Sequence, residues 1–457
     1  MAATTSLTPD PVGELRTSLG GTVLQPADSE YETARRLWNH MIDRRPSVIA
    51  RCSGAADVVR AIAFAREHAL TIAVRGGGHG VAGRASCDDG MVIDLSPMKG
   101  IRVDPDARTA RAQAGVLWAA LDRETQLFGL ATTGGAVSTT GIAGLTLAGG
   151  FGWLMRKHGM VIDNLQSVDL VTADGRCLTV SEHENADLFW AVRGAGANFG
   201  VVTSFEYRLH PVGPVLLGGM VVHPLGNAAA ALRFYREFTA EAPDEVASYA
   251  GLLTTPDGMK VLALAAAYLG PVEEGEKALQ PLRSFGPPVA DLFAPTPYVT
   301  HQTLFDASFP AGRRDYEKST FITDLSEAAV DALVTQMERV PSPNSLIIVE
   351  HHGGAVRRVA EDATAFRHRG PEYNVTVPGG WDEPSEDDEN IAWVRDVVHA
   401  LEPVSTGTYY ANYQAELDRE ERVEAAWGAN YDRLAALKAE YDPENVFRLN
   451  HNVQPAT

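Results

Sequence analysis

Apolar residues recur along the chain at two different spacings, which separates expected helices from expected strands. In residues 55–69, AADVVRAIAFAREHA, they fall every three or four positions, and this predicts an amphipathic helix. The β-branched run TIAVRG that follows predicts a short strand, and MVIDL at 91–95 predicts a buried one. The other elements expected in the first half are hairpins at 101–115 and 165–181, helices at 116–129 and 186–196, and a strand at 199–211.

The second half of the chain begins where prolines and glycines cluster, in HPVGPVLLGG near residue 212. A long hairpin is expected at 247–269, and the runs LIIVEHH and PEYNVTV predict two further strands. Helices are expected at 226–240, 272–283, 326–340 and 386–401. We therefore predict an α+β fold in two parts, the second an antiparallel sheet with helices on one face.

The acidic composition narrows the range of partners. The 457 residues carry a formal net charge of −20, so no broad basic field exists for nucleic acid or for an anionic membrane surface. No apolar run is long enough to cross a bilayer, and the N-terminal MAATTSLTPDPVGELR has no secretory signal pattern. The scattered Cys52, Cys87 and Cys177 form no CxxC pair, which favours reduced thiols. We expect a cytoplasmic protein.

A glycine-rich stretch directly after the first predicted strand, VRGGGHGVAG at 74–83, is a candidate ligand site. It contains a literal GxGxxG, but the following RASCDDG has no helical periodicity, so a nicotinamide-binding turn is not supported. Consecutive glycines can instead aim backbone N–H groups at an anion, and Arg75 adds a cation. A second segment rich in glycine and threonine, at 132–159, suits a long cofactor that lies against main chain.

Longer stretches of the chain resemble a known flavoprotein family. VRGGGHGVAG, GIAGLTLAGGFGWLMRKHGMVIDNL, DLFWAVRGAGANFGVVTSFEYRL, YYANY and YDPENVFRLNHNV resemble, in order and spacing, the FAD-linked oxidases related to berberine bridge enzyme. These belong to the vanillyl-alcohol oxidase and p-cresol methylhydroxylase (PCMH) type of flavoprotein. The resemblance implies a bilobal protein with a PCMH-type FAD-binding domain over 1–212 and a substrate domain over 213–404. A C-terminal segment, 405–457, would complete the FAD-binding domain.

The resemblance also implies how FAD is held. His79 matches the histidine that is typically bonded to the flavin 8α carbon, and a neutral imidazole nitrogen is a competent nucleophile. Val137 stands where some family members carry a second, cysteinyl tether, so a single covalent link is expected. Ile142 is expected near the face of the flavin where oxygen reacts. The other residues expected to contact FAD are Arg75, Gly76, Gly77, Gly78, Gly80, Gly83, Gly134, Gly135, Thr139, Gly141, Gly144, Gly149, Gly152, Trp153, Gly200, Val202, Asn412, Asn450 and Asn452.

Tyrosines near the C-terminus are the expected proton acceptors. On a strand, Tyr409 and Tyr413 would share one face and Tyr410 would lie on the other. The family pattern Y-x-N-Y falls on Tyr410, Asn412 and Tyr413, which implies Tyr413 as the base and Tyr410 near the flavin edge. A strand whose tyrosines simply pack is the alternative.

The run LIIVEHHGG supplies a further catalytic candidate. Family members direct one polar side chain from this strand at the flavin, and Glu350, His351 and His352 compete for that place. Glu350 and His352 share a face, and the adjacent histidines point oppositely, so no metal site is expected. Arg314 and Lys318 could hold an anionic substrate group, although such residues are more often at the surface or salt-bridged.

The function expected from these features is an FAD-dependent oxidase. It would oxidise an alcohol carbon of a small sugar or secondary metabolite and reduce molecular oxygen to hydrogen peroxide. Two alternatives stay open: an FAD dehydrogenase that uses another electron acceptor, and a flavin-binding protein without turnover. A nicotinamide-dependent dehydrogenase is the weakest alternative.

Overall fold

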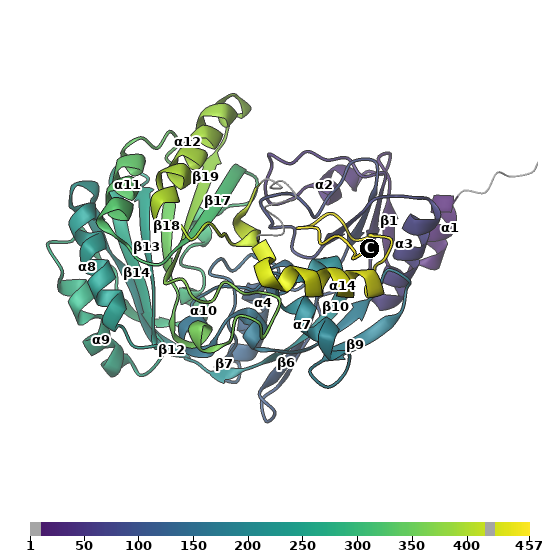
Figure 1. Ribbon diagram of the computed structural model, residues 1–457, viewed down its shortest axis with the longest axis horizontal. Helices are drawn as coiled ribbons and strands as arrows, with labels where there is room; N and C mark the ends of the chain where they lie inside the picture. The colour runs from purple at the N-terminus through teal and green to yellow at the C-terminus, as the bar shows by residue number, and fades with distance from the viewer. Residues whose placement is uncertain (1–10, 416–425) are drawn as a thin grey trace, which may run out of the picture.

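The computed structural model describes residues 11–415 and 426–457, and it divides them into two lobes (Figure 1). The first lobe combines smaller sheets with short helices. The second contains one large antiparallel sheet backed by helices. The predicted α+β, bilobal fold is confirmed. None of the helices in these described ranges is long and apolar enough to cross a membrane.

The first lobe opens with a mixed sheet whose order is β1-β2-β4-β3. Its strands are β1 (Thr22–Leu24), β2 (Val48–Arg51), β3 (Ile72–Arg75) and β4 (Met91–Asp94), with α1 (Pro11–Ser18), α2 (Tyr31–Arg35) and α3 (Ala55–Glu67) beside them. The apolar face that predicted α3 is the face it buries, through Val58, Ala61 and Ile62. Strands β3 and β4 run parallel, and their register places Arg75 opposite Asp94.

A second sheet of the first lobe is antiparallel, with the order β5-β6-β10-β8-β9. It contains β5 (Ile101–Asp104), β6 (Thr109–Gln113), β8 (Leu165–Val171), β9 (Cys177–Ser181) and β10 (Val201–Arg208). Both predicted hairpins are present, β5–β6 and β8–β9. The other elements are α4 (Trp118–Gln126), β7 (Leu130–Ala131), α5 (Ile142–Leu147), α6 (Met155–His158), α7 (Ala186–Ala195) and β11 (His210–Pro211), and β7 pairs with β11.

The second lobe is built on a large sheet with the order β15-β12-β14-β13-β18-β19-β17, and β16 also pairs with β12. Its strands are β12 (Val215–Pro224), β13 (Val246–Thr254), β14 (Lys260–Tyr268), β15 (Ala290–Asp291), β16 (Ala294–Pro297), β17 (Arg314–Ile322), β18 (Ile347–His351) and β19 (Tyr373–Trp381). Helices α8 (Ala228–Glu241), α9 (Val272–Ser284), α11 (Glu327–Glu338) and α12 (Asp387–Ala400) cover its outer face, and α10 (Tyr298–His301) lies near α4 (Figure 1).

Successive residues of the large sheet face two different surroundings, because side chains alternate along a strand. On β18, Ile347 and Val349 are buried in the core beneath the helices, whereas Ile348 and Glu350 face the first lobe. On β19, Val375 is in the same core and Thr376 faces the first lobe. The inner face of this sheet therefore carries polar groups toward the space between the lobes.

The C-terminal segment returns to the first lobe, where α14 (Tyr431–Tyr441) packs against α7 (Figure 1). The buried ammonium group of Lys438 anchors it. This group donates hydrogen bonds to the carbonyl oxygens of Asn198 and Phe447, at 2.7 and 3.0 Å, and lies 2.6 Å from Asp442 Oδ2. The tail is therefore tied to the first lobe by a fully bonded charge pair.

Candidate functional site

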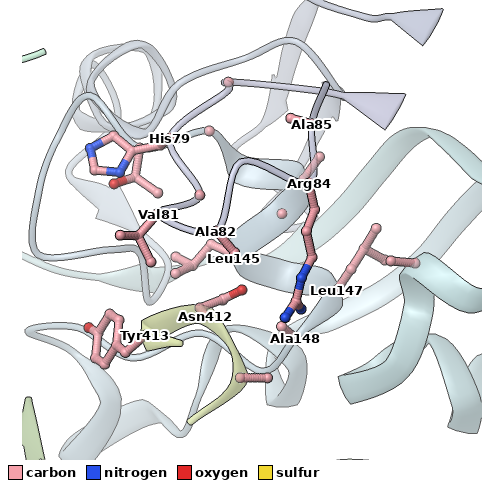
Figure 2. A pocket seen from close by; sticks show the side chains of 18 of the residues that line it. His79, Val81, Ala82, Arg84, Ala85, Leu145, Leu147, Ala148, Asn412 and Tyr413 are labelled. Atoms are coloured by element: carbon pink, nitrogen blue, oxygen red, sulfur yellow. The ribbon is translucent and has the colours of Figure 1, made fainter. Parts of the chain in front are cut away.

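A cavity of about 350 Å³ lies between the two lobes and is the candidate active site (Figure 2). Its size falls in the range typical of small-ligand and cofactor sites. The first lobe contributes the loop after β3 and the segment around α5. The second lobe contributes the inner face of β13, β17, β18 and β19, and residues 411–414 of the C-terminal segment complete the wall.

The two glycine-rich segments meet in the cavity wall. A Cβ atom added to Gly141 would lie 2.6 Å from Gly77 N and 2.7 Å from Gly77 Cα, which is far closer than carbon and nitrogen atoms pack. Glycine is thus required on both sides of this contact. At Gly80 and Gly144, by contrast, no described residue beyond the chain neighbours and the local helix backbone has a heavy atom within 4 Å of the added Cβ. These two positions open toward space that a ligand can fill.

His79 projects from the first glycine segment into the wall (Figure 2). Its ring stacks on Trp38 with a centroid distance of 4.3 Å, and its Nε2 is buried with no hydrogen-bond partner among the described residues. Burial lowers the pKa of His79 to about 4, so the imidazole is neutral at ordinary pH. A neutral, unpartnered ring nitrogen is available for a bond to a ligand.

The structure brings together most, but not all, of the residues expected to contact FAD. Those in the cavity wall are His79, Gly76, Gly77, Gly78, Gly80, Gly135, Gly141, Gly144, Gly200, Val202, Asn412 and Asn450. Those outside it, all within the described part of the chain, are Arg75, Gly83, Gly134, Thr139, Gly149, Gly152, Trp153 and Asn452.

Arg75 does not supply the cation expected beside the glycine loop. Its Nη2 lies 2.7 Å from Asp94 Oδ2 and its Nε donates to Asp94 Oδ1 at 3.2 Å, so the buried guanidinium is neutralised within the protein. Arg84, nine residues further on, lines the cavity instead. Figure 2 shows its side chain reaching toward Ala148, on the other side of the cavity from His79. Among the described residues of the wall, Arg84 is the basic side chain.

Other residues that were expected to contact FAD pack inside the protein. Trp153 is buried in a cluster between the lobes, where its ring lies 4.7 Å from that of Tyr249 and 5.2 Å from that of Phe305. A Cβ on Gly152 would meet the carbonyl oxygen of Gly134 at 1.7 Å. Ile142 is fully buried in the core of the first lobe and is not part of the cavity wall, whereas its neighbours Gly141 and Ala143 are; its place near a bound flavin stays a prediction.

Tyr413 lies on a 3₁₀ turn that Tyr410 directly precedes, and neither residue is on a strand, so the predicted alternation is wrong. The turn spans Ala411–Tyr413, and the two rings contact each other edge to face at 4.9 Å. Tyr413 reaches the cavity, whereas Tyr410 packs behind it against Phe151. The Tyr410 hydroxyl accepts hydrogen bonds from Gly150 N at 3.0 Å and from Asn412 Nδ2 at 2.8 Å. Tyr410 therefore supports the position of Asn412.

Glu350 is the member of the Glu-His-His run that faces the cavity. The Tyr413 hydroxyl donates to Glu350 Oε1 at 3.1 Å, and Asn374 Nδ2 donates to Glu350 Oε2 at 2.7 Å. Burial and the charge of Glu350 raise the pKa of Tyr413 well above its usual value, so the phenol keeps its proton. The two side chains form a tyrosine–carboxylate pair at the wall.

The two histidines after Glu350 have other environments. His351 points to the opposite face of the sheet, where its Nε2 lies 3.0 Å from Arg156 Nη1 and 3.1 Å from Glu372 Oε1. His352 packs against the Phe151 ring, with its Nε2 3.8 Å from Glu350 Oε2. In the described part of the chain, no group of three histidine, cysteine or acidic residues could hold a metal ion.

The two basic residues considered for an anionic substrate group also lie away from the cavity. Arg314 forms a two-bond ion pair with Asp387, at 2.7 and 2.6 Å, and so is salt-bridged. Lys318 lies on β17 next to Glu317, but it is not part of the cavity wall.

Sequence reasoning missed three notable residues of the wall. The Trp38 ring stacks on His79, although the two residues are 41 positions apart in the sequence. No local sequence pattern indicates that Trp38 lines the cavity. Arg84 follows the glycine loop directly, and its basic charge there was an available signal. Glu317 lies on β17 with its carboxyl in the cavity, and only the pairing of β17 with β19 brings it there.

Comparison with known proteins adds a second line of evidence. Residues 46–181 match the family model described as FAD binding domain, and residues 409–454 match the model described as berberine and berberine-like. The chain is 34% identical to an FAD-linked oxidoreductase of Dictyostelium discoideum over 97% of both chains. It is 32% identical to (R)-6-hydroxynicotine oxidase of Paenarthrobacter nicotinovorans, covering 96% of this chain and 97% of that one.

Solved structures show the same similarity in three dimensions. 6-Hydroxy-D-nicotine oxidase from Arthrobacter nicotinovorans superposes with a TM-score of 0.89 at 31% identity, covering 96% of this chain and 99% of the other. The Physcomitrella patens protein BBE-like 1 superposes with a TM-score of 0.89 at 25% identity, covering 98% and 99%. The likeness extends through both lobes.

Proposed function

The chain belongs to the berberine bridge enzyme-like family of FAD-linked oxidoreductases, and we propose that it is an oxidase acting on an alcohol carbon of a small molecule. The observation that carries the proposal is the hydrogen-bonded pair of Tyr413 and Glu350 in the wall of a cavity that His79 also lines. Such a pair can remove the hydroxyl proton of an alcohol.

The proton transfer follows from the hydrogen bond between these two groups. The substrate hydroxyl would donate to the Tyr413 oxygen, while the phenol proton of Tyr413 moves along its existing bond to Glu350 Oε1. The substrate proton then resides on Tyr413, and Glu350 holds the proton that Tyr413 released. Tyr413 never needs to ionise on its own, which its raised pKa would oppose.

The wall fits a flavin on three observations. His79 Nε2 is buried and unpartnered among the described residues, and Gly80 and Gly144 open onto free space. Arg84 contributes positive charge for a diphosphate. We expect His79, the Gly76–Gly80 loop and the α5 segment to hold the cofactor. Bound FAD would supply the acceptor for the substrate hydride and would return electrons to oxygen as hydrogen peroxide.

A covalent link through His79 is part of the proposal. The low pKa of His79 keeps its ring nitrogen neutral, and stacking on Trp38 fixes the plane of the ring. Val137, which lines the cavity, has no atom that could form a second tether. We therefore expect one covalent bond between the chain and FAD.

The purified protein's absorption spectrum, taken before and after acid precipitation, tests the cofactor. Flavin colour should stay with the precipitated protein, and it should pass to the supernatant in His79→Ala. His183→Ala replaces a histidine that is 86% exposed in its side chain and lies outside the cavity, so it should behave as the wild type. Flavin lost to the supernatant from wild-type protein would contradict the covalent link.

A screen of small alcohols with peroxide detection tests the activity. Substrate-dependent peroxide is expected from the wild type. Flavin that is reduced by an alcohol but not reoxidised by air would indicate a dehydrogenase. No reduction by any alcohol would refute the proposed reaction.

A further inference from the structure

Glu317 is an acidic group in the cavity that the proton transfer described above does not use. It lies on β17, where Tyr316 and Ile322 are buried beneath the helices and the alternate residues face the first lobe. Its carboxyl lines the same cavity as Glu350 and Tyr413. Glu317 is therefore positioned to contact a substrate at the Tyr413 end.

One oxygen of the Glu317 carboxyl is held in place by the protein. Thr376 Oγ1, on the neighbouring strand β19, donates a hydrogen bond to Glu317 Oε1 at 2.6 Å. None of the described residues supplies a hydrogen-bond partner for the second oxygen, Oε2. The carboxyl is thus oriented from one side and open to a ligand on the other.

The charged groups that shift the pKa of Glu317 are acidic. Asp315 lies two residues earlier on the same face of β17, and Glu350 lines the same cavity from β18. The charges of both residues raise the pKa of Glu317. Tyr413 and Tyr249 add phenol groups from the C-terminal segment and β13. The nearby guanidinium of Arg313 bonds to Asp315 Oδ1 and to the Ser308 carbonyl, and no described lysine or arginine is paired with Glu317.

A carboxyl that is buried near other acidic groups does not ionise readily. Glu350 accepts hydrogen bonds from Tyr413 and Asn374. Glu317 accepts one, from Thr376, and burial together with the charges of Asp315 and Glu350 raises its pKa to about 8. Glu317 therefore holds its proton at neutral pH.

We propose that Glu317 is a substrate-binding residue that acts as a neutral carboxylic acid and donates a hydrogen bond to a second oxygen of the substrate. The inference rests on the proposed function, from which the alcohol substrate comes. It narrows the class of alcohols that the protein would bind. The neighbouring wall is apolar, with Tyr249, Phe305, Ile348 and Pro378. The substrate is a compact, largely apolar molecule with a second oxygen apart from the hydroxyl that is oxidised.

The protonation state can be read without any substrate. Infrared spectra of the holoprotein should contain a protonated-carboxyl band at pH 7 that is absent in Glu317→Gln and that disappears as the pH rises through about 8. Asp315→Asn serves as the matched control, because Asp315 lies on the same face of β17 outside the cavity and has a pKa raised to about 7. The Glu317 band should remain in that variant and should disappear at a lower pH, because the substitution removes one of the charges that raise the pKa of Glu317. A wild-type spectrum identical to that of Glu317→Gln would overturn the assignment.

The binding role is tested with two probes, cyclohexane-1,4-diol and cyclohexanol, by equilibrium dialysis against the holoprotein. One neutral hydrogen bond corresponds to roughly a tenfold difference in Kd at most. We expect the wild type to bind the diol about five- to tenfold more tightly than cyclohexanol. Glu317→Gln, which keeps a neutral donor, should retain the preference, and Glu317→Leu should lose it.

The outcomes separate this inference from the proposed function. Equal preference in wild type and Glu317→Leu, or no preference in the wild type, would overturn the binding role. Loss of the preference in Glu317→Gln as well as in Glu317→Leu would show that a charged carboxylate is needed. If no alcohol reduced the flavin, the proposed reaction would be refuted. The infrared and dialysis results would still test the protonation state and the binding role of Glu317.

Discussion

The contact between the two glycine segments yields a sharp prediction for Gly141→Ala. The added methyl group would lie 2.6 Å from Gly77 N and 2.7 Å from Gly77 Cα, whereas non-bonded atoms prefer about 3.5–4.0 Å. The two segments must therefore separate by about 1 Å. Overpacking of this kind costs about 1–3 kcal/mol. Backbone strain adds nothing, because Gly141 has a φ of −72° that alanine adopts freely.

Gly144→Ala is the matched control, three residues further along the same segment. Its methyl group would meet no heavy atom within 4 Å, and the residue lies inside helix α5, where alanine is favoured over glycine by about 1 kcal/mol. Gly144 also lines the cavity. This variant should be at least as stable as the wild type and still bind less flavin, because the methyl group occupies cofactor space.

Urea unfolding followed by tryptophan fluorescence measures the first effect, and Trp118, fully buried in the first lobe, is a suitable reporter. The ratio of flavin to protein measures the second. The free energy of unfolding should fall in Gly141→Ala alone, and the flavin ratio should fall in both variants. An unchanged unfolding midpoint in Gly141→Ala would refute the packing argument, and full flavin content in Gly144→Ala would refute the place given to the cofactor.

Three further changes test other parts of the structure. Tyr413→Phe removes the hydrogen bond to Glu350 and should lower kcat about 10²–10⁴-fold in steady-state peroxide assays, with flavin content unchanged. Asp122 is fully buried, and burial raises its pKa from 3.8 to about 7, so the folded state holds this proton more tightly than the unfolded state does. Stability should fall by up to about 4 kcal/mol as the pH rises from 4 through 7, and urea titrations of Asp122→Asn should lack that part of the fall. Lys438→Met leaves the buried carboxylate of Asp442 uncompensated and should cost about 3–5 kcal/mol in the same titrations, and a wild-type midpoint would contradict this.

The local elements and the nature of the ligand site could be predicted from the sequence. Helix α3 and the β8–β9 hairpin depend on spacings of two to four residues, and such spacings decide which side chains share a face wherever the element lies. The glycine segments are also a local property, since only glycine permits the close contact found between Gly77 and Gly141. Glycines that allow two main-chain segments to approach closely can therefore be recognised from the sequence.

Only the tertiary structure decided which charged and polar groups reach the cavity. Arg75 stands opposite Asp94 because β3 and β4 pair in parallel register, and this pairing takes its charge away from the cavity. Glu317 comes beside Thr376 because β17 pairs with β19 across the large sheet. A side chain's charge and proton depend on partners that lie far apart in sequence, because electrostatic and hydrogen-bond energies follow distance in space. The sequence by itself therefore determined the helices, the strands and the two glycine segments of the cavity wall. The packing of the two lobes determined which charged and polar side chains line the cavity.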